Sequence, residues 1–136
     1  MMHTAGFRGA LAVLLFVLVP FLPAAGGTVE RAAGFTESGI ASYYHDRFQG
    51  RTTASGERFD QCAYSAAHRT LPFGTMIRVT RLDTGKSVVV VVNDRGPFKK
   101  GRVVDLSRRA ARDLDMVEKG LIRVKVEVLD QPAHRD

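Results

Sequence analysis

Three polar residues in the middle of the sequence are of the types that transfer protons: Glu57, His68 and Asp94. Asp94 follows the β-branched run Val88–Val92 directly, in the segment Asn93-Asp-Arg-Gly-Pro97. The end of a strand can hold a carboxyl group rigidly at the mouth of a cleft, where it could act as a general acid and base. The Asn-Asp and Gly-Pro pairs also suit an ordinary turn, and the local sequence by itself favours that interpretation.

Glu57 and His68 lie in segments that allow both a functional and a structural interpretation. Glu57 ends the segment Thr53-Ala-Ser-Gly-Glu57, in which Gly56 would let the backbone approach a ligand closely. A solvated loop is nevertheless the usual place for a glutamate. His68 follows small apolar residues, where an imidazole can bind a ligand hydroxyl, orient a carboxylate, or be a satisfied structural group.

A weaker set of candidates could contact a substrate without reacting with it. Tyr44 and Phe98 carry aromatic rings that could stack on a ligand, although aromatic residues near strand ends more often belong to the core. Arg95 follows Asp94 directly and could change its charge environment. We predict Tyr44, Gly56, Arg95 and Phe98 as the substrate-binding residues that accompany the three catalytic candidates.

A fourth acidic residue, Asp105, lies in the apolar segment Val103-Val-Asp-Leu106. A buried aspartate in such a segment more often accepts backbone hydrogen bonds or holds an arginine than it reacts. We therefore expect a structural role for Asp105, with a supporting place near the site as the alternative.

Cysteine and histidine usage argues against a metal centre. Cys62 is the only cysteine, so it cannot form an internal disulfide, and we expect it to be a small apolar filler. No His-x-x-x-His pair accompanies His68, so the sequence offers no zinc-binding pattern. We predict no metal and no cofactor.

The elements that must position these residues are mostly short strands. Apolar residues alternate with polar ones over Ile122–Val128 and over Ile77–Thr80, which predicts strands with one buried face. The continuous run Val88–Val92 predicts a strand buried on both faces. Residues 103–106 and Ile40–Tyr44 are further strand candidates, and residues 82–86 carry the turn residues of a hairpin.

Helices are few in this pattern. Ser107 can cap a helix over Arg108–Leu114, in which the apolar residues share one side, and Ala66–Thr70 could add one further short turn of helix. Many short strands with one or two helices predict a small barrel or sandwich. We predict a single ordered domain over residues 38–129, followed by a loose tail over 130–136.

The N-terminal segment has the pattern of a secretion signal. A short end with Arg8 precedes the apolar run Ala10–Val19, and small residues follow at Ala24–Gly27. The run is shorter than the roughly 20 apolar residues of a membrane-spanning helix. We predict a signal peptide over residues 1–26, a flexible leader over 27–37, and an exported protein of the periplasm or cell envelope without a stable membrane anchor. An uncleaved anchor is the alternative.

The charge balance restricts the partners. The chain has 20 Lys and Arg against 14 Asp and Glu, and after the predicted signal 19 remain against 14, a net charge of +5, which suits a polyanionic partner outside the cytoplasm. Its basic residues are scattered apart from Lys99–Arg102 and Arg108–Arg109, so no clustered face predicts nucleic-acid binding. We expect a monomer that does not bind nucleic acid.

Three segments in order resemble the rare lipoprotein A family of double-psi β-barrels. They are Ile40-Ala-Ser-Tyr-Tyr through Thr53-Ala-Ser-Gly-Glu-Arg-Phe-Asp60, Ala66-Ala-His-Arg-Thr-Leu-Pro-Phe-Gly-Thr75, and Val92-Asn-Asp-Arg-Gly-Pro-Phe98 with Gly101-Arg-Val-Val-Asp-Leu-Ser107. The match runs from about Gly39 to Val128, and three segments in the right order are far more specific than one motif. The resemblance implies a six-stranded double-psi β-barrel.

The resemblance also implies an activity and a site. Members of the family are endolytic lytic transglycosylases, which cleave the bond between N-acetylmuramic acid and N-acetylglucosamine in peptidoglycan and leave anhydro-muramyl ends. It favours Asp94 as the acid and base, and it places Glu57 at the family's second acidic position and His68 at its site histidine. Two rival functions stay open: a non-catalytic, expansin-like wall-binding module, and a glycoside hydrolase that uses Asp94 and Glu57 as a pair.

Two departures from the family pattern bear on location and binding. The family's name refers to a lipid-bearing cysteine after the signal, and this sequence has none there, so we expect a soluble form. Relatives usually carry tryptophan where Tyr43 stands, and this sequence has no tryptophan. One sugar-stacking platform is therefore changed, although Tyr43 and Tyr44 could replace it.

Overall fold

The computed structural model describes residues 34–133, so the predicted signal peptide lies outside the described residues. One short α-helix, one 3₁₀ helix and six strands make up the described part of the chain. In chain order they are β1 (Thr36–Tyr43), η1 (Asp46–Phe48), β2 (Ser65–Ala67), β3 (Met76–Arg81), β4 (Ser87–Asp94), β5 (Arg102–Leu106), α2 (Arg108–Asp113) and β6 (Ile122–Asp130).

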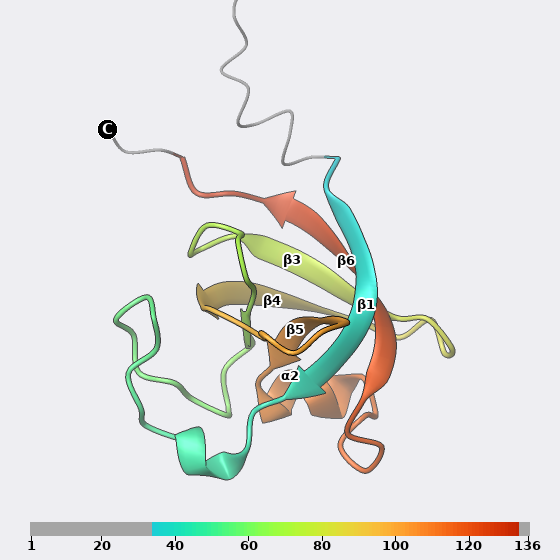
Figure 1. Ribbon diagram of the computed structural model, residues 1–136, viewed down its shortest axis with the longest axis horizontal. Helices are drawn as coiled ribbons and strands as arrows, with labels where there is room; N and C mark the ends of the chain where they lie inside the picture. The colour runs from blue at the N-terminus through green and yellow to red at the C-terminus, as the bar shows by residue number, and fades with distance from the viewer. Residues whose placement is uncertain (1–33, 134–136) are drawn as a thin grey trace, which may run out of the picture.

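The six strands close into a barrel in the order β1-β5-β2-β4-β3-β6, which confirms the predicted fold class (Figure 1). β1 pairs in parallel with β5, and β2 pairs in parallel with β4, while the other four neighbours are antiparallel. In this order β1 and β2 are not neighbours, and neither are β4 and β5. The segments that connect these strands therefore cross from one part of the barrel to another as loops, and these loops carry most of the candidate site.

The barrel interior is filled by the apolar residues that alternate along the strands. Ile122, Val124, Val126 and Val128 of β6 are buried, as their alternation predicts. Val128 is in register with the buried Ile77 of β3, and Val126 with the buried Val79. α2 lies across one end of the barrel, with Ala110 and Ala111 in the core. Ser107 caps this helix by accepting a hydrogen bond from the backbone N–H of Ala110, as predicted.

Three expectations about local structure are wrong. Residues 65–67 form strand β2 instead of a turn of helix, because small buried residues fit between β4 and β5. The run Val88–Val92 is buried on one face only, and Val89 and Val91 point outwards, because the outer face of β4 is open to solvent. Cys62 is exposed and fills no gap in the core.

Two boundaries differ by a few residues from the expected domain. β1 begins at Thr36, within the segment assigned to the flexible leader, because Thr36 and Glu37 pair with β6. β6 extends to Asp130, the first residue of the expected tail. The hairpin turn over residues 82–86 connects β3 and β4 as predicted.

Candidate functional site

One row of residues crosses four neighbouring strands where β4 ends. Ser42 on β1 is in register with Asp105 on β5, Asp105 with Ala67 on β2, and Ala67 with Asp94 on β4. Residues in register on adjacent strands point to the same face of the sheet. The fold therefore brings Ser42, Asp105 and Asp94 together although they come from three different segments of the sequence.

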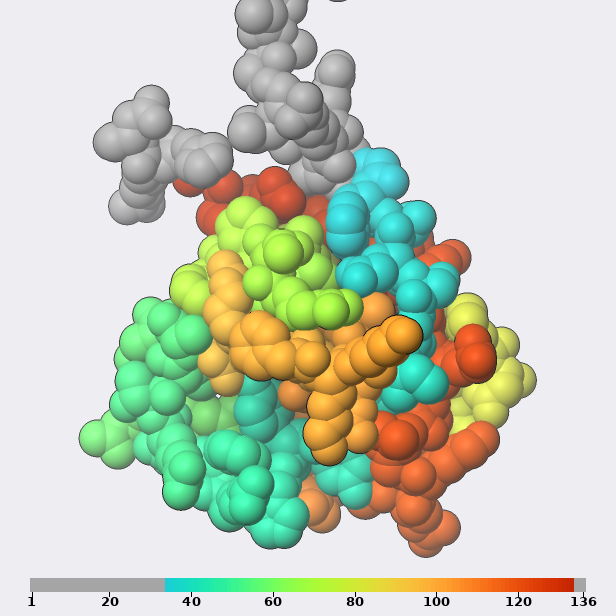
Figure 2. All heavy atoms as spheres, viewed as in Figure 1, coloured from blue at the N-terminus to red at the C-terminus, as the bar shows by residue number. Residues whose placement is uncertain are grey.

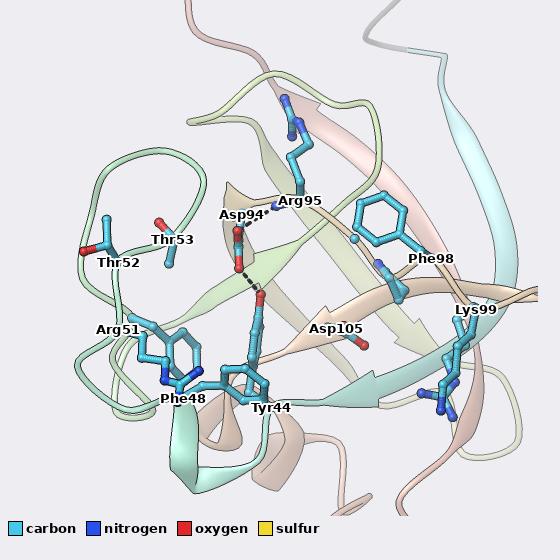
Figure 3. A pocket seen from close by; sticks show the side chains of 14 residues that line it. Tyr44, Phe48, Arg51, Thr52, Thr53, Asp94, Arg95, Phe98, Lys99 and Asp105 are labelled. Atoms are coloured by element: carbon cyan, nitrogen blue, oxygen red, sulfur yellow. Dashed lines mark hydrogen bonds between the residues drawn. The ribbon is translucent and has the colours of Figure 1, made fainter.

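Asp94 is fixed by three hydrogen-bond donors. Its Oδ1 accepts bonds of 2.9 Å from the backbone N–H groups of Ala54 and Arg95, and its Oδ2 accepts a bond of 2.5 Å from the Tyr44 hydroxyl (Figure 3). The backbone carbonyl of Asp94 accepts a further bond from the N–H of His68. Asp94 is thus a rigidly held acceptor that is only partly exposed.

Tyr44 supports Asp94 from the first loop. Its ring packs on Phe59 at 4.2 Å between centroids and on Phe48 at 5.7 Å. Burial, the hydrogen bond to Asp94, and the negative charges of Asp94 and Asp105 all raise the pKa of Tyr44 far above its usual value. The hydroxyl therefore stays protonated and donates a hydrogen bond to Asp94. Tyr44 thus positions a carboxylate, a role that the sequence did not suggest.

An open pocket of about 450 Å³ lies in front of this row. Ligand sites in proteins commonly have volumes of this order. Its walls come from the loop after β1 and from the segment between β4 and β5, which lie next to each other on the face shown in Figure 2. Its lining residues are Tyr44, Phe48, Arg51, Thr52, Thr53, Phe59, Asp94, Arg95, Gly96, Pro97, Phe98, Lys99, Arg102 and Asp105.

The rim of the pocket is basic and carries one prominent aromatic ring. Arg51, Lys99 and Arg102 all line it. Phe98 is 80% exposed at the tip of the segment that follows Asp94 (Figure 3). An exposed ring beside polar groups is suited to stacking on a ligand, so a substrate-binding role for Phe98 stays a prediction that its place in the pocket allows.

Asp105 lies in the same pocket and is half-buried. The hydroxyl of the buried Ser42 donates a hydrogen bond to its Oδ1. Burial raises the pKa of Asp105, the bond from Ser42 and the charges of Arg102 and Lys99 oppose that change, and the charge of Asp94 adds to it. The residue expected to be structural therefore faces the pocket as a second carboxyl group.

His68 is placed outside this pocket, on the other side of the loop after β2. Its ring is 3% exposed, and its Nδ1 accepts hydrogen bonds from the backbone N–H groups of Thr70 and Leu71. Nδ1 therefore carries no proton, and the Nε2–H group donates to Glu37 at 2.8 Å. The His68 ring ties the loop after β2 to β1, and only its backbone N–H reaches Asp94.

Glu57 and Gly56 lie in the loop whose residue Ala54 donates to Asp94, but neither residue lies in the pocket where it was predicted. Glu57 is exposed, and neither residue is among those that line the pocket. The backbone carbonyl of Glu57 accepts hydrogen bonds from Thr53, which does line it. Gly56 has a φ of 90°, so it provides the left-handed turn of this loop, with open space around its Cα.

Arg95 is bound to the protein on the side away from the Asp94 carboxylate (Figure 3). One guanidinium nitrogen donates to the carbonyl groups of His68 and Leu71, and the guanidinium lies 3.9 Å from the centre of the Phe73 ring. Arg95 thus joins the loop after β2 to the end of β4, and its backbone N–H holds Asp94.

Of the residues predicted from the sequence, Asp94, Tyr44, Arg95 and Phe98 line the pocket. Asp105 also lines it, which was only the alternative for that residue, and the contact of Ser42 with Asp105 was not predicted. A signal for Asp105 was available, because it stands alone among apolar residues on a strand. Its register with Ser42 is set by strand pairing, which the sequence does not state.

Within residues 34–133, no three His, Cys, Asp or Glu side chains gather in a way that could hold a metal ion. In the same part of the chain, none of the helices has the length and apolar character needed to cross a membrane.

A closed six-stranded barrel of this topology, with a carboxyl-lined pocket at the end of β4, defines the class: a double-psi β-barrel protein. Residues 36–126 match the lytic transglycolase family, and the chain belongs to that family.

Two relatives share about half of their matched residues with this chain. A probable endolytic peptidoglycan transglycosylase RlpA from Treponema pallidum (strain Nichols) is 55% identical over 96 residues, which are 71% of this chain and 30% of the relative. The endolytic peptidoglycan transglycosylase RlpA of Pasteurella multocida (strain Pm70) is 47% identical over 102 residues, 75% of this chain and 35% of the relative. The chain thus spans about a third of the length of these curated relatives.

Solved structures with the same barrel include an expansin from Clavibacter michiganensis. It is 27% identical with a TM-score of 0.56, and the match covers 74% of this chain and 53% of the expansin. A substituted form of that expansin, in complex with cellohexaose, is 26% identical with a TM-score of 0.55, covering 74% of this chain and 54% of that one.

Proposed function

We propose that this chain is an endolytic peptidoglycan lytic transglycosylase that cleaves the bond between N-acetylmuramic acid and N-acetylglucosamine. The observation that carries the proposal is the rigidly held Asp94 in an open pocket with a basic rim. Membership of the lytic transglycolase family and the names of the two relatives support it.

The reaction needs proton transfer and no activated water. An acid protonates the oxygen that leaves C1 of the muramic residue, and a base takes the proton of the C6 hydroxyl as its oxygen closes the anhydro ring. A carboxyl group in the pocket can supply either function, and Asp94 lies where the sugar would be bound. Phe98 provides a stacking surface at the rim, and Arg51, Lys99 and Arg102 attract an anionic glycan.

The two rival functions differ in what they require of the pocket. A hydrolase that pairs Asp94 with Glu57 needs both carboxyl groups to flank the scissile bond, and Glu57 does not line the pocket. A wall-binding module without catalysis has more support, because the structural likeness to expansin extends to a form in complex with cellohexaose. It remains the second candidate.

The location of action is part of the proposal. The apolar run and small residues near the N-terminus support export, and the periplasm or cell envelope is where peptidoglycan strands are available.

Product analysis separates the three functions. Purified protein is incubated with purified peptidoglycan, and the released fragments are identified by mass spectrometry. We expect anhydro-muramyl ends. Reducing ends would instead support the hydrolase, and stable binding without release would support the wall-binding module.

A further inference from the structure

We infer that Asp105 is the second catalytic carboxyl group of this pocket: it donates the proton that starts glycan cleavage, and Asp94 accepts the proton released at ring closure. The inference rests on the proposed function, because it assigns the two proton transfers of that reaction to two residues. It also replaces Glu57 as the partner of Asp94.

The register of the barrel places the two carboxyl groups on either side of one small residue. Asp105 and Asp94 both pair with Ala67, one on β5 and the other on β4. Neighbouring strands lie about 4.8 Å apart, so two strand spacings separate the two backbones by roughly 10 Å. Both side chains line the same pocket, so a single sugar unit above Ala67 can contact both groups.

The surroundings of Asp105 suit a proton donor. Burial has the largest effect on the pKa of Asp105: it raises that pKa and favours the protonated form. The charged, titratable or polar groups that face it are Ser42 from β1, Tyr44 from the loop after β1, Lys99 and Arg102 from the segment before and at β5, and Asp94 from β4. Ala67, its neighbour on β2, carries no charge. Ser42, Arg102 and Lys99 oppose the effect of burial without cancelling it.

The surroundings of Asp94 suit a proton acceptor. Two backbone N–H groups and the Tyr44 hydroxyl all donate to its carboxylate. Tyr44 stays protonated, since its pKa is raised by burial and by the neighbouring carboxyl groups. Two carboxyl groups in contrasting environments are how one site provides both an acid and a base at a single pH.

The step consumes no water and no other reactant. The Asp105 carboxylic acid protonates the glycosidic oxygen, and the bond from that oxygen to C1 of the muramic residue breaks. The C6 oxygen of the same residue then bonds to C1, and its proton passes to the Asp94 carboxylate. Solvent returns that proton from Asp94 to Asp105, which restores both groups for the next cycle.

The test compares Asp105→Asn and Ser42→Ala with the unmodified protein, using release of anhydro-muramyl ends as a function of pH. Asp105→Asn should lower the rate about 10²- to 10⁴-fold while binding of peptidoglycan is kept. Activity should fall as pH rises through the pKa of Asp105, because the protonated form is required. Ser42→Ala should move this alkaline limit to higher pH, since the Ser42 hydroxyl stabilises the ionised form.

Ser38→Ala is the matched control, because Ser38 is an exposed serine on the same strand, and its pH profile should equal that of the unmodified protein. An Asp105→Asn protein that cleaves at the normal rate would overturn the inference, as would an alkaline limit that Ser42→Ala leaves in place. If Asp105→Asn does not fold, the Ser42→Ala profile decides alone. If the unmodified protein releases no anhydro ends, the proposed function fails and the inference fails with it.

Discussion

At the scale of single residues, the site depends on acceptors that are held by several donors each. Asp94 receives three hydrogen bonds and His68 Nδ1 receives two. Hydrogen bonds to a charged group contribute more than neutral ones, and an unsatisfied buried donor is costly. Substitutions at these residues therefore change both the local geometry and the capacity for proton transfer. A useful variant keeps the hydrogen-bond geometry and removes only the proton transfer.

Asp94→Asn should keep the fold and remove most of the cleavage. The amide oxygen can still accept from the N–H groups of Ala54 and Arg95, and the Tyr44 hydroxyl oxygen can accept a hydrogen bond from the new amide NH₂. Loss of general acid and base catalysis typically lowers a rate about 10²- to 10⁴-fold. Release of anhydro-muramyl ends and the thermal midpoint are measured together. A stable Asp94→Asn protein with normal activity would refute a catalytic role for Asp94.

His68 should act as a positioning residue, and His68→Asn tests this. The side-chain oxygen of asparagine can replace Nδ1 as acceptor for Thr70 and Leu71, whereas His68→Ala leaves both N–H groups unsatisfied. We expect His68→Ala to lower the free energy of unfolding by about 1–3 kcal/mol and to reduce kcat, and His68→Asn to recover most of both. Equal loss of activity in the two variants, with His68→Asn fully stable, would show instead that the imidazole itself transfers a proton.

At the scale of elements, the end of β5 and the start of α2 connect the pocket to the core. Ser107 is fully buried, caps α2, and donates its hydroxyl to the carbonyl of Ala63. It follows Asp105 by two residues, so the same turn that begins the helix fixes the strand on which Asp105 lies. The helix is short, and its position depends on this cap and on burial of Ala110 and Ala111.

Ser107→Ala should lower the free energy of unfolding by about 1–2 kcal/mol, because a helix cap and a buried hydrogen bond are both lost. Chemical denaturation measures this loss. Ser87→Ala, at the exposed first residue of β4, is the control and should change stability by less than about 0.5 kcal/mol. Equal stabilities of the two variants would show that the cap contributes little to this barrel.

At the scale of the whole molecule, the barrel is a rigid support that presents two long loops on one side. The segment after β1 and the segment between β4 and β5 form the pocket walls, and both are held by bonds to the barrel, such as that from the N–H of Ser55 to the carbonyl of Asn93. The residues after the predicted signal have 19 Lys and Arg against 14 Asp and Glu, and this positive charge would favour approach to a polyanion.

Export should be accompanied by cleavage of the N-terminal segment between about Ala24 and Thr28. The apolar run is the part that the export machinery recognises, so Leu15→Arg should keep the protein inside the cell at its full length. His3→Arg adds a positive charge before the run and should leave export unchanged. Mass spectrometry of the exported fraction measures the cleavage, and intact protein that starts at Met1 in that fraction would contradict it.

The sequence by itself determined a mainly β domain and the positions of most strands, because alternation over residues 122–128 and 77–80 turns one apolar side of each strand inwards. The strand pattern allowed a barrel or a sandwich, and the resemblance to a known family pointed to the barrel. The sequence also determined that Asp94 ends a strand, since the β-branched run stops just before it. These features depend on residues that are close in the sequence, so short-range patterns are enough to predict them.

Tertiary structure alone decided which polar residues share a pocket. Ser65–Ala67 has no strand pattern of its own and becomes β2 only because β4 and β5 bind it on both sides. That short strand sets the register by which Asp105 and Asp94 flank Ala67, and it turns His68 towards Glu37 and away from the pocket. Register between distant strands follows from closure of the barrel, and no stretch of sequence specifies it alone.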